Sequence, residues 1–163
     1  MRNMSNTAIE NLLLFLQPKL GQELHVGDWL VIDQLRIDQF AKVTGDEQWI
    51  HIDPERAKKE SPYGATVAHG FLTLSLLPFL TQSNHPAYFQ QNYPGMKYRV
   101  NMGVNKVRFP APVVVGARVR ARTVLLNAEV TGESVQVVYK FTIEIDGKDK
   151  PACVAESVVR VFP

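Results

Sequence analysis

Residues 71–80 place apolar side chains on nearly every face of a helix. A helix on the surface of a protein shows one apolar stripe, so a helix of this kind must be enclosed. The enclosure is expected from the second half of the chain, where the hydrophobic period changes from helical to two. Residues 135–145 alternate apolar and mostly polar side chains, which predicts a half-buried antiparallel strand.

Other β-rich runs cover about residues 97–109, 118–129 and 152–162, and turn-forming residues separate them. Four or five antiparallel strands that follow an all-round apolar helix predict a sheet curled about that helix, with one dry face and one wet face. A chain of 163 residues suits a single domain, here 1–163. The expected fold class is α+β.

The first half of the chain predicts short elements. Helices are expected over residues 7–16, from Asp33 to about residue 44, and from Asp53 to about residue 59, with a short strand over residues 30–32. Residues 84–95 are rich in aromatic residues and proline and show no periodicity. We expect a surface connection there; the alternative is a lid or pocket wall.

Composition gives no support to several classes of function. With 18 Lys and Arg against 16 Asp and Glu, the formal charge of +2 gives no electrostatic argument for a nucleic-acid partner. No apolar run approaches the roughly 20 residues of a membrane helix, and no signal-peptide pattern begins the sequence. Cys153 is the one cysteine and is expected to be a buried structural thiol. A cytoplasmic protein without a membrane partner is expected.

The candidate site lies in residues 44–54, where Asp46 and His51 are five positions apart. On a helix they would point about 140° apart, and on a strand they would face opposite sides. Gly45 permits a tight turn, so an irregular loop can aim both side chains at one point. A carboxylate and an imidazole that share a water form a general acid/base pair near neutral pH. The alternative is an ordinary turn residue and a half-buried structural histidine.

Three segments carry a motif in a fixed order: Phe40 to Asp46, His51 with Asp53-Pro54, and Ala68-His69-Gly70. In this order they resemble the hydratase motif of the MaoC-like dehydratases, the (R)-specific enoyl-CoA hydratase family. The nodulation-protein-N-like branch is the closer match, on residues 44–51, 68–76 and 105–112. The resemblance therefore covers nearly the whole chain.

The resemblance implies a hot-dog fold, an antiparallel sheet wrapped around a long central helix, and commonly a homodimer formed by edge-to-edge pairing of two sheets. It implies (R)-specific hydration of trans-2-enoyl thioesters, or the reverse dehydration of (R)-3-hydroxyacyl thioesters. The acyl carrier would be coenzyme A or acyl carrier protein, and no metal or redox cofactor is required. Asp46 and His51 take the catalytic positions, and Gly70 takes that of the backbone oxyanion donor. Which of the two side chains is acid and which is base stays open.

One departure concerns Gln48 and Trp49, which stand where most hydratases of the family have Asn-Pro. Gln48 keeps an amide that could orient the water or a catalytic side chain, while the loss of proline changes the stiffness of the loop. Trp49 is expected to be a structural anchor rather than a substrate contact.

Further polar residues have two interpretations each. His69 could join Asp46, His51 and Asp53 as a metal ligand, although its place before Gly70 and the apolar helix favours a structural or loop-fixing role. Lys106 and Arg108 are candidate contacts for the phosphates of coenzyme A. The alternating Arg118, Arg120 and Arg122 fit either such contacts or a solvated face.

Two other functions stay open at this stage. Hot-dog folds also host thioesterases, because a fold does not fix a function. A noncatalytic acyl-CoA-binding module is the third possibility, and the intact acid/base pair argues against it.

Overall fold

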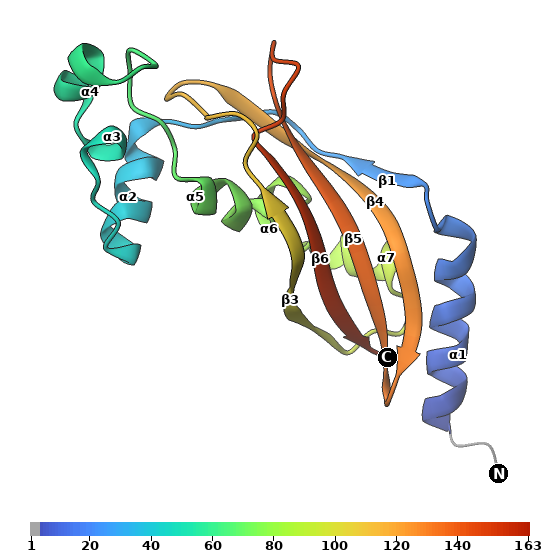
Figure 1. Cartoon of the computed structure of the whole chain (residues 1–163). Coiled ribbons are helices and arrows are strands. Elements are labelled where there is room, and N and C mark those ends of the chain that lie inside the picture. Colours follow the sequence, from blue (N-terminus) through green and yellow to red (C-terminus); the bar gives the residue numbers. More distant parts are fainter. Residues whose placement is uncertain (1–3) are drawn as a thin grey trace.

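Six antiparallel strands form one curved sheet in the computed structural model, which describes residues 4–163. The long strands are β3 (Tyr98–Arg108), β4 (Arg118–Thr131), β5 (Ser134–Ile145) and β6 (Cys153–Phe162). The short strands β1 (Glu23–Val26) and β2 (Leu30–Val31) both pair with β4. The order β1-β4-β5-β6-β3 leaves β3 at an edge of the sheet (Figure 1). The long strands confirm the prediction within a few residues, whereas β1 was not expected.

The two faces of the sheet differ as the alternation predicts. On β4 the buried residues alternate with arginines that point to the other face and pair with acids. The buried residues are Val119, Ala121, Thr123 and Leu125. The ion pairs join Arg118 to Asp146, Arg120 to Glu144, and Arg122 to Glu144 and Glu23. The solvated-face interpretation of the three arginines is thereby supported.

Helix ends in the first half follow the capping signals of the sequence. The N-terminal α1 (Met4–Leu16) continues into a short 3-10 turn, η1 (Gln17–Lys19). The Asp33 carboxylate accepts the Arg36 N–H at 2.9 Å at the start of α2 (Gln34–Thr44). In the same way Asp53 accepts the Arg56 N–H at 2.9 Å at the start of α4 (Pro54–Glu60). A short helix that was not expected, α3 (Trp49–Ile52), lies between α2 and α4.

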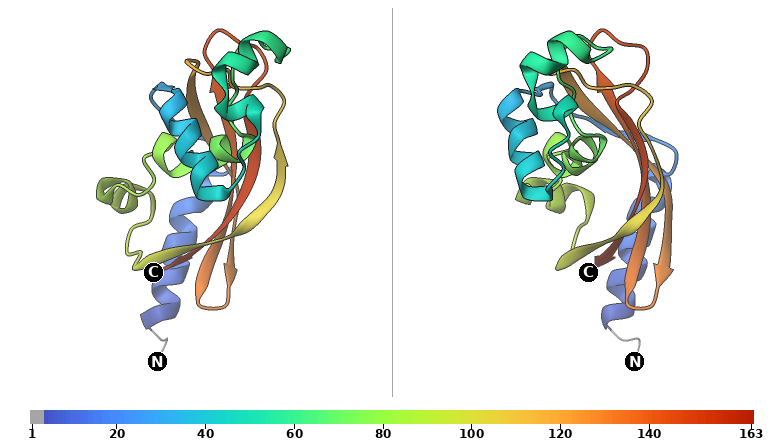
Figure 2. Two further views of the ribbon diagram at one scale, coloured as in Figure 1. Left: turned by 90° about the vertical axis from the view of Figure 1, so that its left-hand side faces the viewer. Right: turned by 60° about the vertical axis from the view of Figure 1, so that its left-hand side comes forward.

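The central helix is shorter than the sequence predicted. It divides into α5 (Gly70–Ser75) and α6 (Leu77–Leu80), with a break at Leu76. Pro78 explains the break, because proline has no N–H and its ring crowds the preceding turn, so it fits only the first turn of a new helix. The enclosure is also incomplete: the side chains of Phe71 and Phe79 are 67% and 60% exposed. Both helices lie on the concave side of the sheet (Figure 2).

Two apolar clusters fill the space beneath the helices. One joins α5 and α6 to the sheet and includes Ile37, Leu72 and Val119. The other joins α1 to the far half of the sheet and includes Leu12 and Tyr93. The Cys153 thiol is buried, as expected, and burial raises its pKa to about 11.

Residues 84–95 lie mostly at the surface, as expected, but they form a helix and part of the segment lines a cavity. This segment contains α7 (Pro86–Asn92), which starts with proline in its first turn and with the His85 ring accepting the Ala87 N–H at 3.2 Å. Tyr93 is buried in the second cluster, and Tyr88 packs against that cluster. Tyr88 and Phe89 line a cavity, so the segment is a pocket wall. In the described part of the chain, no helix is both long and apolar enough to cross a membrane.

Candidate active site

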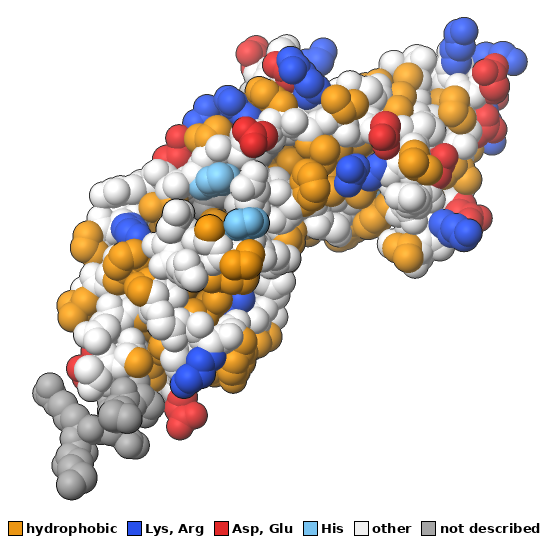
Figure 3. Space-filling view, turned by 180° about the vertical axis from the view of Figure 1, so that it is seen from behind, with side chains coloured by type: hydrophobic (Ala, Val, Ile, Leu, Met, Phe, Trp, Pro, Cys, Tyr) orange, Lys and Arg blue, Asp and Glu red, His pale blue; other side chains and the backbone are white. Residues whose placement is uncertain are grey.

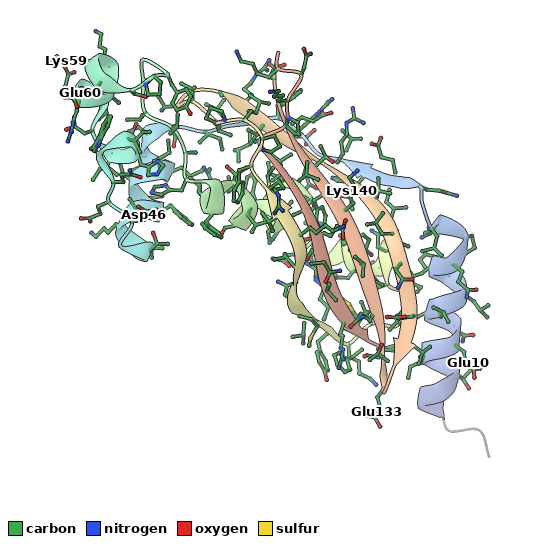
Figure 4. All side chains as sticks on the ribbon, in the orientation of Figure 1. Glu10, Asp46, Lys59, Glu60, Glu133 and Lys140 are labelled. Atoms are coloured by element: carbon green, nitrogen blue, oxygen red, sulfur yellow. The ribbon has the colours of Figure 1, made fainter. Side chains whose placement is uncertain are left out.

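Asp46, His51 and His69 meet at the end of the molecule where α2, α3 and α4 gather (Figure 1). They come from the loop after α2, from α3, and from the residue before α5. One polar atom of each lies within 4.8 Å of one of each of the others. Figure 4 shows Asp46 beside the α2–α3 connection. The predicted convergence of Asp46 and His51 is therefore present.

Asp46 is placed by the end of α2. Gly45 has the left-handed backbone conformation, with φ 77°, and its N–H donates to the Ala41 carbonyl at 2.8 Å. The Thr44 hydroxyl lies 3.4 Å from the Asp46 N–H, which donates to it. The Asp46 side chain is 57% exposed, so its carboxylate is open to a water or a ligand.

His51 is fixed through one of its ring nitrogens. Nδ1 lies 2.6 Å from the Val67 carbonyl, and because a carbonyl only accepts, Nδ1 carries the proton. In the neutral ring Nε2 is then an acceptor. Burial lowers the pKa of His51 below its ordinary value, the nearby His69 lowers it further, and the Val67 bond and Asp46 oppose the shift. The ring is thus kept neutral near pH 7, with Nε2 ready to take a proton.

Gln34 holds the main chain of His51 from the start of α2. Its amide nitrogen donates to the His51 carbonyl at 2.8 Å. Its amide oxygen accepts the hydroxyl of the buried Thr66 at 2.6 Å. This amide therefore ties α2 to α3 and to the strand-like segment that leads to Gly70.

His69 is almost fully buried, with 3% of its surface exposed. Its Nε2 donates to the main-chain carbonyl of Asp46 at 2.9 Å, and its ring stacks on His51 with centroids 3.8 Å apart. Within residues 4–163, its Nδ1 is buried without a hydrogen-bond partner. The loop-fixing role is supported, because this ring contacts both candidate catalytic residues. Asp53, the fourth residue of the metal alternative, caps α4 instead.

Gly70 is the first residue of α5, where the N–H groups have no acceptor within the helix. The ring of Phe109 covers this glycine so closely that a Cβ would lie 2.9 Å from Cδ2 of the ring. Only glycine fits here without displacing the aromatic ring.

The family model described as "MaoC like domain" matches residues 15–145. A "3-hydroxyacyl-thioester dehydratase Z" of Mycobacterium tuberculosis is 50% identical over 141 residues, which cover 86% of this chain and 89% of that protein. The chain belongs to the MaoC-like dehydratase family. "Nodulation protein N" of Rhizobium leguminosarum bv. viciae is 46% identical over 138 residues, covering 84% of this chain and 83% of the relative.

A solved structure agrees on the fold of this MaoC-like chain. The (R)-hydratase from A. caviae, titled as involved in PHA biosynthesis, superposes with a TM-score of 0.62 over 86% of this chain and 98% of that one, at 24% identity. The predicted family and the hot-dog fold are confirmed.

The other predicted site residues lie outside this convergence. In this MaoC-like chain Gln48 is exposed at the start of α3, and its main-chain carbonyl accepts the His51 N–H at 2.9 Å. Trp49 is half-buried, with the Arg56 guanidinium 4.4 Å from its ring centroid. On the exposed β3, Lys106 lies 3.7 Å from Glu156, and Arg108 donates to the Val107 carbonyl. The last two stay candidate phosphate contacts.

Gln34 and Thr66 were missed by the sequence reasoning. The one available signal was a polar threonine next to Val67 and Ala68 in an otherwise apolar segment, because a buried hydroxyl needs a partner. Nothing in the sequence identifies that partner as Gln34.

Proposed function

We propose that the chain catalyses the reversible addition of water to trans-2-enoyl thioesters of coenzyme A or acyl carrier protein, giving (R)-3-hydroxyacyl thioesters. The observation that carries the proposal is the convergence of Asp46 and His51 beside the start of α5, where the Gly70 N–H lies in the first turn and has no acceptor within the helix. The M. tuberculosis relative, named a 3-hydroxyacyl-thioester dehydratase and 50% identical, supports the same reaction class. The enzyme is a hydro-lyase in this proposal.

The proposed chemistry follows from the positions of three groups. Asp46 and His51 hold one water between them, and one of the two takes a proton as the water oxygen bonds to the β-carbon. The electrons of the double bond move toward the thioester oxygen, which accepts the Gly70 N–H. The proton taken from the water then passes through the other side chain to the α-carbon, and the pair returns to its starting state. No metal or redox cofactor is needed for these steps.

We also propose a homodimer, paired through the β3 edges. An edge strand with exposed apolar side chains is a template for another strand. On β3 the exposed residues include Tyr98, Val100, Met102 and Val104. On the face seen from behind, apolar side chains lie among polar and charged ones (Figure 3). Sedimentation should give twice the mass of one chain, and Val100→Lys with Met102→Lys should give the mass of one.

The test of the reaction is hydration of crotonyl-CoA and of longer enoyl-CoAs. Asp46→Asn and His51→Ala should each lower the rate by about a hundredfold to ten-thousandfold, the usual contribution of a general acid or base. Asp53→Asn is the matched control: it makes the same chemical change seven residues away, and Asn still caps α4. Unchanged rates in the first two variants would show that the site assignment is wrong.

Two competing functions are separated in the same assay. A thioesterase would release free thiol from acyl-CoA, which a thiol reagent detects. A noncatalytic binding module would bind acyl-CoA and turn over no chain length.

A further inference from the structure

A cavity of about 850 Å³ adjoins the far end of α5 from Gly70. Leu74 and Ser75 of α5 form part of its wall, Tyr139 and Val159 line it from the sheet, and α7 closes another side. Its volume lies in the range of small-molecule pockets. Its lining does not include Asp46, His51 or Gly70, so an acyl chain whose thioester oxygen met the Gly70 N–H would have to run along α5 to enter the cavity.

The charged lining of this cavity has one sign. Lys97 and Arg99 are both among the lining residues, and none of the lining residues is Asp or Glu. The Arg99 guanidinium donates to the Ser83 hydroxyl at 2.9 Å and to the Asn84 amide oxygen at 3.1 Å. Both acceptors are neutral, and Ser83 is buried. The arginine is therefore held in place without a compensating charge from these partners.

Arg99 differs from the arginines on the outer face of β4. Arg118, Arg120 and Arg122 each pair with a carboxylate. Over residues 4–163, the ion pairs within 4.0 Å do not include Arg99. The charge of Arg99 also acts on the cavity wall. Burial raises the pKa of Tyr88, and the Arg99 guanidinium partly opposes that rise. A guanidinium in this setting matches a carboxylate in charge and in geometry.

The distance from Gly70 to the cavity sets the length of acyl chain that can enter it. From Gly70 to Ser75, where the cavity wall begins, α5 rises on the order of 7 Å, at about 1.5 Å per residue. An extended chain advances roughly 1.1 Å per bond, since a residue of three main-chain bonds spans about 3.3–3.6 Å. An acyl chain therefore needs at least about seven bonds to reach the cavity wall at Ser75, and more to reach Arg99 beyond it.

We propose that this cavity receives the acyl tail of the substrate and that Arg99 binds a carboxylate at the far end of that tail. The preferred substrates are then enoyl thioesters of medium-length dicarboxylic acids. This inference rests on the proposed hydratase function. A methyl-ended tail of the same length would leave the guanidinium without its counter-charge and would bind more weakly.

The test compares three enoyl-CoAs: crotonyl-CoA, a methyl-ended chain of about twelve carbons, and the same chain ended by a carboxylate. The wild type should show a kcat/KM roughly tenfold or more higher for the carboxylate-ended chain than for the methyl-ended chain. Arg99→Gln should abolish this preference. Lys140→Gln, which removes a charge from an exposed position of β5 (Figure 4), should keep it. No preference in the wild type, or an unchanged preference in Arg99→Gln, overturns the proposal.

Three more measurements separate the possible outcomes. They tell whether Arg99 binds a carboxylate of the acyl tail or a phosphate of the carrier, and whether the hydratase assignment itself fails. Crotonyl-CoA is too short to reach Arg99, so its hydration reports the proposed function alone, and its absence refutes that function rather than the tail site. If Arg99→Gln instead weakens every CoA substrate and the loss disappears with pantetheine thioesters, Arg99 binds a phosphate of the carrier and the tail proposal is wrong. Inhibition of the wild type by a free dicarboxylate should exceed that by the monocarboxylate of equal length; equal inhibition contradicts the proposal without any variant.

Discussion

The imidazole rings of His51 and His69 stack with their centroids 3.8 Å apart and their planes 27° apart. Each ring also donates to a main-chain carbonyl, His51 to Val67 and His69 to Asp46. His69 thus touches His51 through its ring and holds Asp46 through the backbone. Because two adjacent positive rings repel each other, the stack favours a neutral His51.

His69 is expected to be a positioning residue, and two variants separate its contacts. His69→Phe keeps an aromatic ring against His51 and removes the donor to the Asp46 carbonyl. Its kcat should fall about tenfold to a hundredfold with little change in KM, because the Asp46 loop loses its anchor. His69→Gln keeps an amide donor and should recover part of that loss. Kinetics with crotonyl-CoA measure both, and a His69→Phe enzyme as fast as the wild type would exclude the positioning role.

The pH profile gives a second prediction, whose sign follows from the lowered pKa of His51. The Nδ1 bond to Val67 leaves Nε2 to accept a proton, so we propose His51 as the base; a base must be neutral, so kcat/KM should decline only as pH falls through a value below the ordinary 6.5. In His69→Phe this acidic limb should move to higher pH, since His69 contributes to the lowering. An acidic limb above pH 6.5 in the wild type would contradict the assignment.

The same shift affects stability. Between the lowered folded-state pKa and about 6.5, the unfolded chain binds more protons at His51 than the folded chain does. The free energy of unfolding therefore rises with pH across that window. The gain in stability from His51 is complete above the window and is lost as pH falls through it. Urea unfolding of wild type and His51→Gln should give curves that diverge there; parallel curves would contradict the prediction.

Much of the fold was predictable because one face of the sheet is buried. A strand with one buried face must alternate, so β4 and β5 show in the sequence almost to their ends. The division of the central helix was harder to predict from the sequence. Pro78 signals a break, but the sequence does not say that Phe71 and Phe79 would face outward, since exposure depends on what packs against them. The helix α7 depends on Tyr88 and Tyr93 reaching the second cluster, a contact that periodicity cannot reveal.

The candidate site, like the fold, was predictable only in part. Gly45 before Asp46 predicts a turn, and the structure places Asp46 and His51 together as expected. The Gln34–Thr66 hydrogen bond joins residues 32 positions apart, so it exists only once the chain has folded. The roles of Gln48, Lys106 and Arg108 stay predictions.

Gly70→Ala tests the close approach of Phe109. Alanine favours a helix more than glycine does, so the substitution alone should not weaken α5. The new Cβ would meet the Phe109 ring at 2.9 Å and push the Gly70 N–H out of position. We expect kcat/KM to fall about tenfold to a hundredfold, as small displacements in a site do. Adding Phe109→Leu should restore part of the rate, and Phe109→Leu alone is the control. Wild-type kinetics for Gly70→Ala would show that the close contact is unimportant.

The last prediction concerns Tyr93 and Tyr139, whose buried hydroxyl groups bond to each other beneath the cavity. Tyr139→Phe leaves the Tyr93 hydroxyl without this partner and should lower the free energy of unfolding by about 1–3 kcal/mol. The double change to phenylalanine removes both groups, so it should cost less than the sum of the single changes. Burial raises the pKa of both residues, so this coupling should not vary between about pH 6 and pH 9. Urea unfolding of the wild type, the two single variants and the double variant measures this coupling. Strictly additive losses would show that the two hydroxyls act independently.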